Sequence, residues 1–259
     1  MRKQKNKKIK KILLFIIFVI ALSGFGVMQV SAGAGTGPSF QVGLGDYDSP
    51  DSIADSINIL IFLTVIALAP SILILLTGFT RILIVLSFTR NAMGLQQTPP
   101  NQVLIGLALF LMFFLMSPIF ARMNDEALQP YINEEIELEE AFDRAMLPLR
   151  EFMFKQVHPS DLNTMLAISN HPPPDELSDI ATEVLIPAFV LNEIKRAFII
   201  GFFIYVPFLI IDLVVASTLM SLGMMMLPPA MVSMPFKLLI FMLVDGWGLI
   251  LETLMTSFN

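Results

Sequence analysis

Four long apolar runs constrain most strongly what this chain can fold into. They cover residues 57–76, 101–120, 184–219 and 231–255. A helix of about 20 apolar residues is long enough to cross the hydrocarbon layer of a bilayer. Hydrophobic residues make up 55% of the chain and charged residues only 15%, whereas soluble domains carry about 25% charged residues. The sequence therefore predicts an all-α membrane protein with about four hydrophobic segments.

Residues 1–32 have the three parts of a secretory signal peptide. Seven basic residues lie within Met1–Lys11, an apolar core follows at Ile12–Leu22, and small residues end the segment at Val30-Ser31-Ala32. An uncleaved anchor helix is the alternative. Because a linker of small residues follows, we expect cleavage after Ala32, which takes the formal net charge from −6 to −13. Such an acidic chain, without a basic stripe, is not expected to bind nucleic acid.

Composition divides the rest of the chain into four regions. We expect a flexible extracytoplasmic linker at 33–56, a first helical hairpin at 57–120, an acidic extracytoplasmic helical region at 121–183, and a second hairpin with a methionine-rich loop at 184–259. The segment from Arg122 to Glu183 contains fourteen carboxylates and only four basic residues. A solvated helix face accounts for these carboxylates, and specific cation binding is the alternative.

Prolines give expectations about the geometry of the helices. The sequence predicts a kink at Pro70, a helix end at Pro99-Pro100, and interruptions at Pro187 and Pro207. Arg81 and Arg90 indicate that the turn near them faces the cytoplasm. Residues 151–166 have apolar side chains at helical spacing, which is typical of a moderately amphipathic helical segment.

Charged residues fall inside the last two apolar runs. They include Asp212, Lys237, Asp245 and Glu252, in addition to Glu193, Lys195 and Arg196 in the first half of the third run. A charge at the centre of a lipid-exposed helix costs at least about 2.5–3.5 kcal/mol. These charges are therefore expected either to pair inside a bundle or to belong to helices that lie partly outside the bilayer. A proton relay through Asp212, Lys237 and Asp245 is the alternative.

Three consecutive methionines, Met224, Met225 and Met226, lie between the last two runs. Gly223 precedes them and Pro228-Pro229 follow, which makes a regular helix unlikely to form there. Irregular backbone at membrane depth is tolerated only where protein buries it or where it lines a cavity. Because methionine adapts its shape to its surroundings, the segment predicts a soft apolar collar around a passage. Ordinary core packing is the alternative.

The sequence offers no catalytic, cofactor or metal motif. It has no cysteine, no phosphate-binding loop and no paired histidines at zinc spacing. His158 and His171 lie in polar, proline-containing surroundings that are typical of solvated loops. We therefore expect a protein that is not an enzyme and needs no cofactor.

Four stretches resemble the FliP family of flagellar export-gate proteins. They are Thr80–Arg90 continuing into Gly94–Gln102, Pro187–Phe198, Asp212–Pro229 and Pro235–Leu239. The resemblance covers nearly all of 57–258. It implies the pore-forming core of a type III export gate that passes unfolded flagellar proteins across the membrane. The related injectisome subunit is the alternative, although the leader and the acidic region are more similar to the flagellar branch.

The resemblance also implies an assembly. FliP-like proteins form a ring of five copies, joined by FliQ-like and FliR-like subunits, in a helical cone of bent hairpins. FlhB-like and FlhA-like export components are further implied partners. The implied location is the bacterial cytoplasmic membrane, at the centre of the flagellar basal body, with part of the cone lifted above the membrane plane.

Particular residues match the family's motifs. The resemblance implies that Met224, Met225 and Met226 form a gasket in the closed pore, and that Glu193, Lys237 and Phe152 contact neighbouring subunits. Around His158 the local sequence departs from the family's pattern. An ion channel or secondary transporter and a scaffold without a pore are the rival interpretations, and a transporter would be favoured by inverted repeats, which the sequence lacks.

Overall fold

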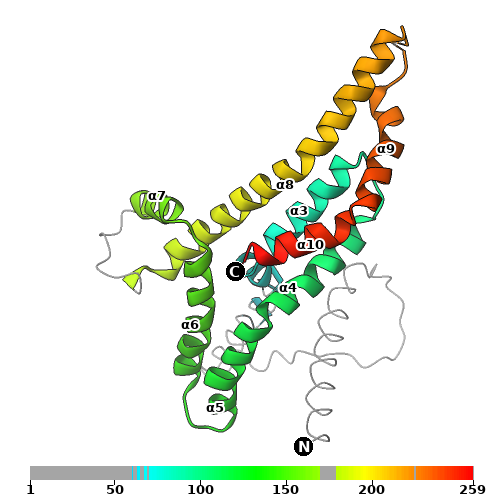
Figure 1. Ribbon diagram of the computed structural model, residues 1–259. Helices are drawn as coiled ribbons and strands as arrows, with labels where there is room; N and C mark the ends of the chain where they lie inside the picture. Colours follow the sequence, from blue (N-terminus) through cyan, green and yellow to red (C-terminus); the bar gives the residue numbers. More distant parts are fainter. Residues whose placement is uncertain are drawn as a thin grey trace, which may run out of the picture. The chain divides into compact units, whose positions relative to one another are not determined.

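The computed structural model describes residues 60, 63–64, 67–68, 70–169, 179–224 and 226–258 (Figure 1). These residues form helices and the turns between them, without a strand. The expectation of an all-α protein is therefore confirmed for the described part of the chain. The predicted signal peptide at 1–32 and the linker at 33–56 lie outside the described residues.

The described helices follow one another along the chain. A short helix at Pro70–Leu76 precedes α3 (Phe79–Ala92), α4 (Asn101–Met123), the π-helical turn η1 (Asn124–Leu128), α5 (Gln129–Ile132), α6 (Leu138–Gln156), α7 (Pro159–Ser169), α8 (Thr182–Ser221), α9 (Pro229–Leu243) and α10 (Gly246–Thr256).

Two of these helices are long and apolar enough to cross a membrane. They are the continuous helix Asn101–Ile132 and α8. Two pairs of helices are also long and apolar enough when each pair is counted as one bent span. One pair is Pro70–Leu76 with α3, bent by 80°, and the other is α9 with α10, bent by 66°. By length and composition, the described part of the chain thus holds between two and four spans. The bend in the first pair follows Leu76 rather than falling at Pro70, where the sequence predicts a kink.

The prediction that Pro187 and Pro207 interrupt the third apolar run is wrong. Both prolines lie inside α8, which continues for 40 residues. At 1.5 Å per residue this helix is about 60 Å long. A break in an apolar setting would leave more backbone groups without hydrogen-bond partners than each proline removes. The helix therefore continues through both prolines.

The predicted end of the helix that contains Arg81 is also wrong. The helix that contains Arg81 ends at Ala92 rather than at Pro99-Pro100, because Gly94 adopts a φ of 81° that reverses the chain. The amphipathic stretch at 151–166 is two helices, α6 and α7, that meet at His158. Gly94 follows the end of α3, and the extended backbone of Val157 together with Pro159 at the start of α7 separates α6 from α7.

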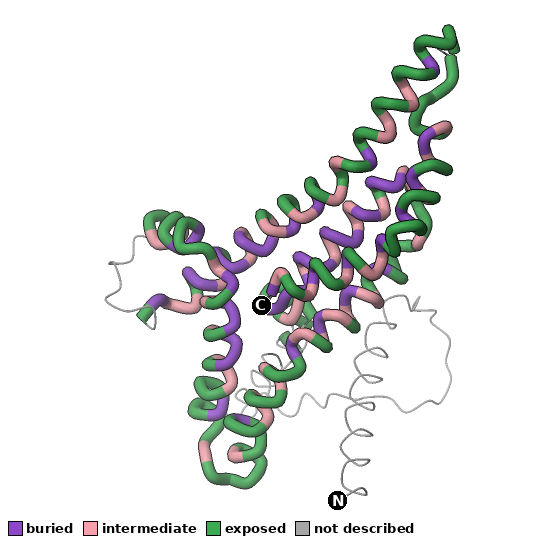
Figure 2. The backbone as a smooth tube through the Cα atoms, viewed as in Figure 1, coloured by how far each residue is buried: buried purple, intermediate pink, exposed green. Residues whose placement is uncertain are grey.

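Helix α3 lies at the centre of the core. It packs against α8 and α4, and its residues Ile82, Val85 and Leu86 are completely buried. Figure 2 shows burial concentrated along α3, α6 and the first half of α8, whereas the joined ends of α8 and α9 are mostly exposed. The backbones of α3 and α8 approach closely where Gly201 meets the ring of Phe88.

The acidic region packs against the membrane helices through both α6 and α7. Arg122 at the end of α4 donates a 2.6 Å hydrogen bond from Nη1 to Glu151 Oε2 on α6. This bond lowers the pKa of the Glu151 carboxyl. The contact is therefore present at neutral pH and is lost as the pH falls through the lowered pKa. Both side chains are about half exposed, so the pair contributes little to stability.

We predict that Gly201→Ala destabilises the protein. An added Cβ would lie 2.7 Å from Cγ of Phe88, and overpacking of this kind costs about 1–3 kcal/mol. Thermal unfolding of the purified protein in mild detergent measures the loss. Gly106→Ala in α4 is the control, because its Cβ would meet no atom within 4 Å. Equal melting temperatures for the two variants would contradict the close approach of α3 and α8.

Candidate functional site: the methionine loop and its supports

The methionine loop, Leu222–Pro228, joins α8 to α9 at one end of this hairpin (Figure 1). Gly223 ends α8 with a φ of 75°, a conformation that favours glycine. The N–H of Gly223 donates to Met220 O and the N–H of Met224 donates to Leu219 O, each at 3.0 Å. Pro229 then begins α9. The backbone of the loop is therefore irregular, as the flanking glycine and prolines predicted.

Within the chain, the two described methionine side chains of the loop are exposed. Met226 is 98% exposed and Met224 is 45% exposed. Met225 lies outside the described residues. Two neighbouring leucines, Leu222 and Leu227, are also exposed. The loop is thus a surface-exposed apolar segment, and core packing within one chain does not account for Met224 and Met226.

A polar cluster ties together α8, α9 and the end of α3 below the loop. Lys237 Nζ donates to Asp212 Oδ2 at 2.6 Å and to Ala92 O at 3.2 Å, and Ser233 Oγ donates to Asp212 Oδ1 at 2.5 Å. Lys237 is 3% exposed. Asp212 and Lys237, which lie in the last two apolar runs, therefore pair with each other, as one of the two alternatives drawn from the sequence predicts. This pairing reduces the cost of placing them in an apolar setting.

A second polar cluster surrounds Arg81, whose side chain is completely buried. Its Nε donates to Glu193 Oε2 at 3.0 Å, and its Nη2 donates to the other oxygen of the same carboxylate. Nη2 also donates to Gln156 Oε1 at 3.1 Å, and Nη1 donates to Ser257 O at 2.8 Å. The guanidinium carbon lies 3.8 Å from the ring centre of Phe258.

The Arg81 cluster joins four separate parts of the chain. Gln156 brings in the end of α6, and its Nε2 donates to Phe258 O at 2.7 Å. Asn192 on α8 donates from Nδ2 to Gln156 O at 2.8 Å. Because α3, α6, α8 and the residues after α10 all supply partners, the cluster fixes the base of the α8–α9 hairpin relative to the acidic region.

The sequence did not predict this role of Arg81. We interpreted it as a marker of a turn that faces the cytoplasm, but its side chain has no exposed surface. The signal available was an arginine followed directly by Ile82-Leu83-Ile84 and carried inside an apolar helix. Such a charge needs a partner, and Glu193 is one of several carboxylates that the apolar runs contain.

The structure places the residues that the family resemblance assigns to subunit contacts inside the chain. Glu193 is 1% exposed and pairs with Arg81. Phe152 is buried, and its ring packs edge-on against Phe189, with 5.8 Å between ring centres. Their intrachain partners are thus defined, and their contacts with other subunits stay a prediction.

Asp245 lies at the bend between α9 and α10. Its φ of 49° and ψ of 53° place it in the left-handed region, and its side chain is exposed. Within the described residues, no ion pair involves Asp245 or Glu252. The proposed relay through Asp212, Lys237 and Asp245 therefore has a direct hydrogen bond only between its first two members.

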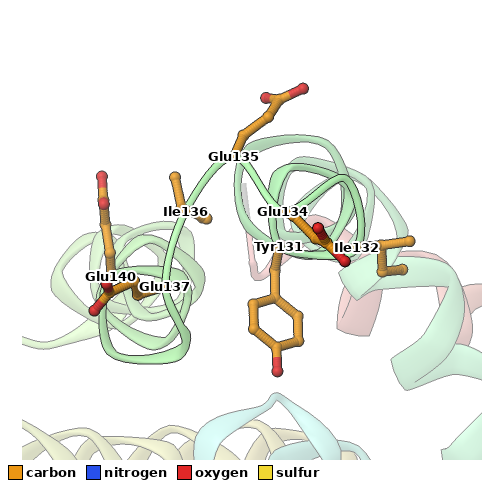
Figure 3. Close-up of a pocket in the computed structure, with 7 residues that line it drawn as sticks. All are labelled: Tyr131, Ile132, Glu134, Glu135, Ile136, Glu137 and Glu140. Carbon is orange, nitrogen blue, oxygen red and sulfur yellow. The ribbon is translucent and has the colours of Figure 1, made fainter.

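The acidic turn between α5 and α6 forms a shallow hollow (Figure 3). It is lined by Tyr131, Ile132, Glu134, Glu135, Ile136, Glu137 and Glu140. Figure 3 shows the carboxylate of Glu135 pointing away from those of Glu137 and Glu140. In the described part of the chain, no group of three or more potential ligands could hold a metal ion.

Comparison with known proteins gives a consistent result. A family model described as the FliP family matches residues 62–254. The chain is 53% identical over 209 residues to the flagellar biosynthetic protein FliP of Bacillus subtilis, which covers 81% of this chain and 95% of that protein. It is 47% identical over 227 residues to the FliP protein of Treponema denticola, an alignment that covers 87% of this chain and 84% of that protein. It is 45% identical over 244 residues to the FliP protein of Caulobacter vibrioides, an alignment that covers 94% of this chain and 90% of that protein.

We predict that Glu193→Gln destabilises the protein by about 3–5 kcal/mol, the cost of leaving one buried charge without its counter-ion. Thermal or denaturant-induced unfolding in mild detergent measures the effect. Glu140→Gln is the matched control, because Glu140 pairs with Arg144 on an exposed helix face and such pairs are worth less than about 1 kcal/mol. A loss of stability as small as that of the control would show that the Arg81 cluster does not support the fold.

Proposed function

Because the chain belongs to the FliP family, a component of the flagellar export apparatus, we propose that it is a pore-forming core subunit of the flagellar export gate. In this proposal it lies in the cytoplasmic membrane at the centre of the basal body, and unfolded flagellar proteins pass through the assembled pore. The exposed methionine loop at the end of the α8–α9 hairpin is the observation that carries the proposal.

Exposure of the loop supports a role between copies of the chain. Met226 is 98% exposed and Met224 is 45% exposed, so both are free to meet the same loop of other subunits around an axis. Cyclic symmetry repeats one loop around a central passage. Converging thioethers exclude water, and a dewetted apolar constriction blocks ions. Flexible methionine side chains also adapt to the varied side chains of a passing polypeptide.

The long apolar faces of the hairpin support an assembly as well. Large apolar side chains on α8 are exposed, among them Phe198, Phe202, Phe203, Leu209 and Leu213. Because α8 is about 60 Å long and the hydrocarbon layer about 30 Å thick, lipid alone does not cover a straight helix of this length. Neighbouring subunits would cover the remainder. We propose five copies of this chain together with FliQ-like and FliR-like subunits, and FlhA-like and FlhB-like components as further partners.

The alternatives receive less support. The related injectisome subunit would use the same loop, but the relatives described above are named as flagellar proteins. A proton-conducting channel needs ionisable groups connected along a path. Here Asp212 and Lys237 bond to each other, to Ser233 and to a backbone carbonyl. This arrangement favours a structural support for the loop.

We predict that replacing Met224, Met225 and Met226 with alanine increases ion leakage through the assembled gate and leaves assembly intact. Shorter side chains would open the constriction to water. Membrane conductance in cells that produce the variant measures the leakage, and the yield of oligomer in mild detergent measures assembly.

The matched control is a variant in which Met220, Met231 and Met242 are replaced with alanine. These methionines are 59%, 69% and 80% exposed but lie on α8 and α9 rather than in the loop. Conductance that rises equally in both triple variants, or in neither, would contradict a seal formed by the loop.

A further inference from the structure

Some charged side chains on the apolar helices α3, α4, α8, α9 and α10 have no counter-ion within the chain. Those that form no ion pair with another described residue are Arg90, Glu183, Arg196, Asp245 and Glu252. Glu183 lies in the first turn of α8 and Asp245 at the N-cap of α10, where helix dipoles favour carboxylates. Arg90 lies in the last turn of α3, where the dipole favours a cation, and donates to Asn101 Oδ1 at 2.6 Å. One cation, Arg196, and one carboxylate, Glu252, are left.

Arg196 on α8 lies one turn after Glu193 but does not pair with it. Both oxygens of Glu193 accept hydrogen bonds from Arg81, and Asp161 on α7 pairs with Lys195. Arg196 is partly exposed and forms no hydrogen bond with a described residue. The Arg81 cluster and Arg196 together therefore carry one positive charge that no neighbouring carboxylate neutralises.

The surface beside Arg196 is apolar. Exposed side chains follow it at helical spacing along one face of α8, and they are Ile199, Phe203, Ile210 and Val214. A cation at the edge of such a stripe is costly wherever water is excluded and no counter-ion is present. Whatever covers the stripe is therefore expected to bring a negative charge to Arg196.

Glu252 has the complementary property on α10. It lies on the exposed side of this helix, away from the buried Ile250 and Leu254. Its carboxylate accepts no hydrogen bond from a described residue, and Leu249, one turn earlier, is 53% exposed. This face of α10 therefore offers a carboxylate beside an apolar side chain.

Arg196 and Glu252 lie at similar distances from the Arg81 cluster. Arg81 bonds to both Glu193 and Ser257, which places these two residues at one level. Arg196 is three residues beyond Glu193, about 4.5 Å along α8, and Glu252 is five residues before Ser257, about 7.5 Å along α10. Figure 1 shows α10 running from the end of α9 towards the start of α3, so both displacements point towards the methionine-loop end.

We propose that Arg196 of one copy forms an ion pair with Glu252 of the next copy. The proposal rests on the ring proposed above and adds the contact that fixes the register between neighbours. A head-to-tail ring joins two different surface patches of each copy. The patch around Arg196 and the patch around Glu252 differ in charge, share apolar neighbours and lie on different helices, as such a contact requires.

Disulfide crosslinking tests the contact in membranes of cells that produce the full-length protein, because the chain has no cysteine. We expect Arg196→Cys combined with Glu252→Cys to give a ladder of crosslinked copies. Each single variant stays uncrosslinked, because identical positions do not meet in a head-to-tail ring. Arg196→Cys combined with Asp245→Cys is the matched control and crosslinks less, since Asp245 lies seven residues, or about 10 Å, farther along α10.

The outcomes separate this contact from the proposed ring. Oligomer recovered in mild detergent without the crosslink between positions 196 and 252 would overturn the contact and leave the ring in place. A chain that stays monomeric in membranes and in mild detergent would contradict the ring as well. A disulfide that forms only within one chain would also overturn the contact.

A double-mutant cycle tests whether the two charges interact. We expect Arg196→Gln and Glu252→Gln each to lower the yield of oligomer in mild detergent by roughly 2- to 10-fold, the range for a partly covered ion pair. The double variant is expected to lose no more than either single variant, because the pair is already broken. Losses that add, or yields that equal the wild-type yield, would overturn the pair.

Discussion

The buried guanidinium of Arg81 is the interaction on which the arrangement of the helices depends. A charge without exposed surface is tolerated only when its counter-ion and its hydrogen bonds are in place. Glu193, Gln156 and Ser257 supply these partners from three other parts of the chain. Helices α3, α6 and α8 and the segment after α10 must therefore come together before the energetic cost of burying Arg81 is offset. The cluster makes one arrangement of these helices much more favourable than alternatives in which the pair is broken.

Burial is distributed unevenly along α8, and this has consequences for the methionine loop. The first half of α8 contains Glu193 and most of its buried residues, whereas beyond Gly201 only Phe208 and Leu219 are buried. The Lys237–Asp212 pair is the polar tie that connects this second half to α9 and to the end of α3. The hairpin is therefore firmly held at its base and lightly held towards its end. Such a gradient allows the end to change shape without unfolding the base.

The sequence predicts the class of the fold better than it predicts where helices end and which charged side chains pair. Apolar periodicity and length predicted the helices, and the methionine loop followed from Gly223 and the prolines after it. The sequence does not predict the ends of α3 and α6, because the left-handed Gly94 and the extended backbone of Val157 determine them locally. The Arg81–Glu193 pair joins residues 112 positions apart. Composition shows that each charge needs a partner, but only the packing of the helices selects which one.

The chemistry of the loop limits what can surround it. A side chain as exposed as Met226 gains nothing from hydrophobic burial within its own chain, and burying it against another apolar surface would be favourable by about 1.5–3 kcal/mol. A flat lipid surface would provide this gain but would not require the irregular backbone that Gly223 and Pro228 impose. Backbone of this kind at membrane depth must be covered by protein or line a cavity. In the assembly that we propose, symmetry-related loops that meet around a passage would satisfy both requirements.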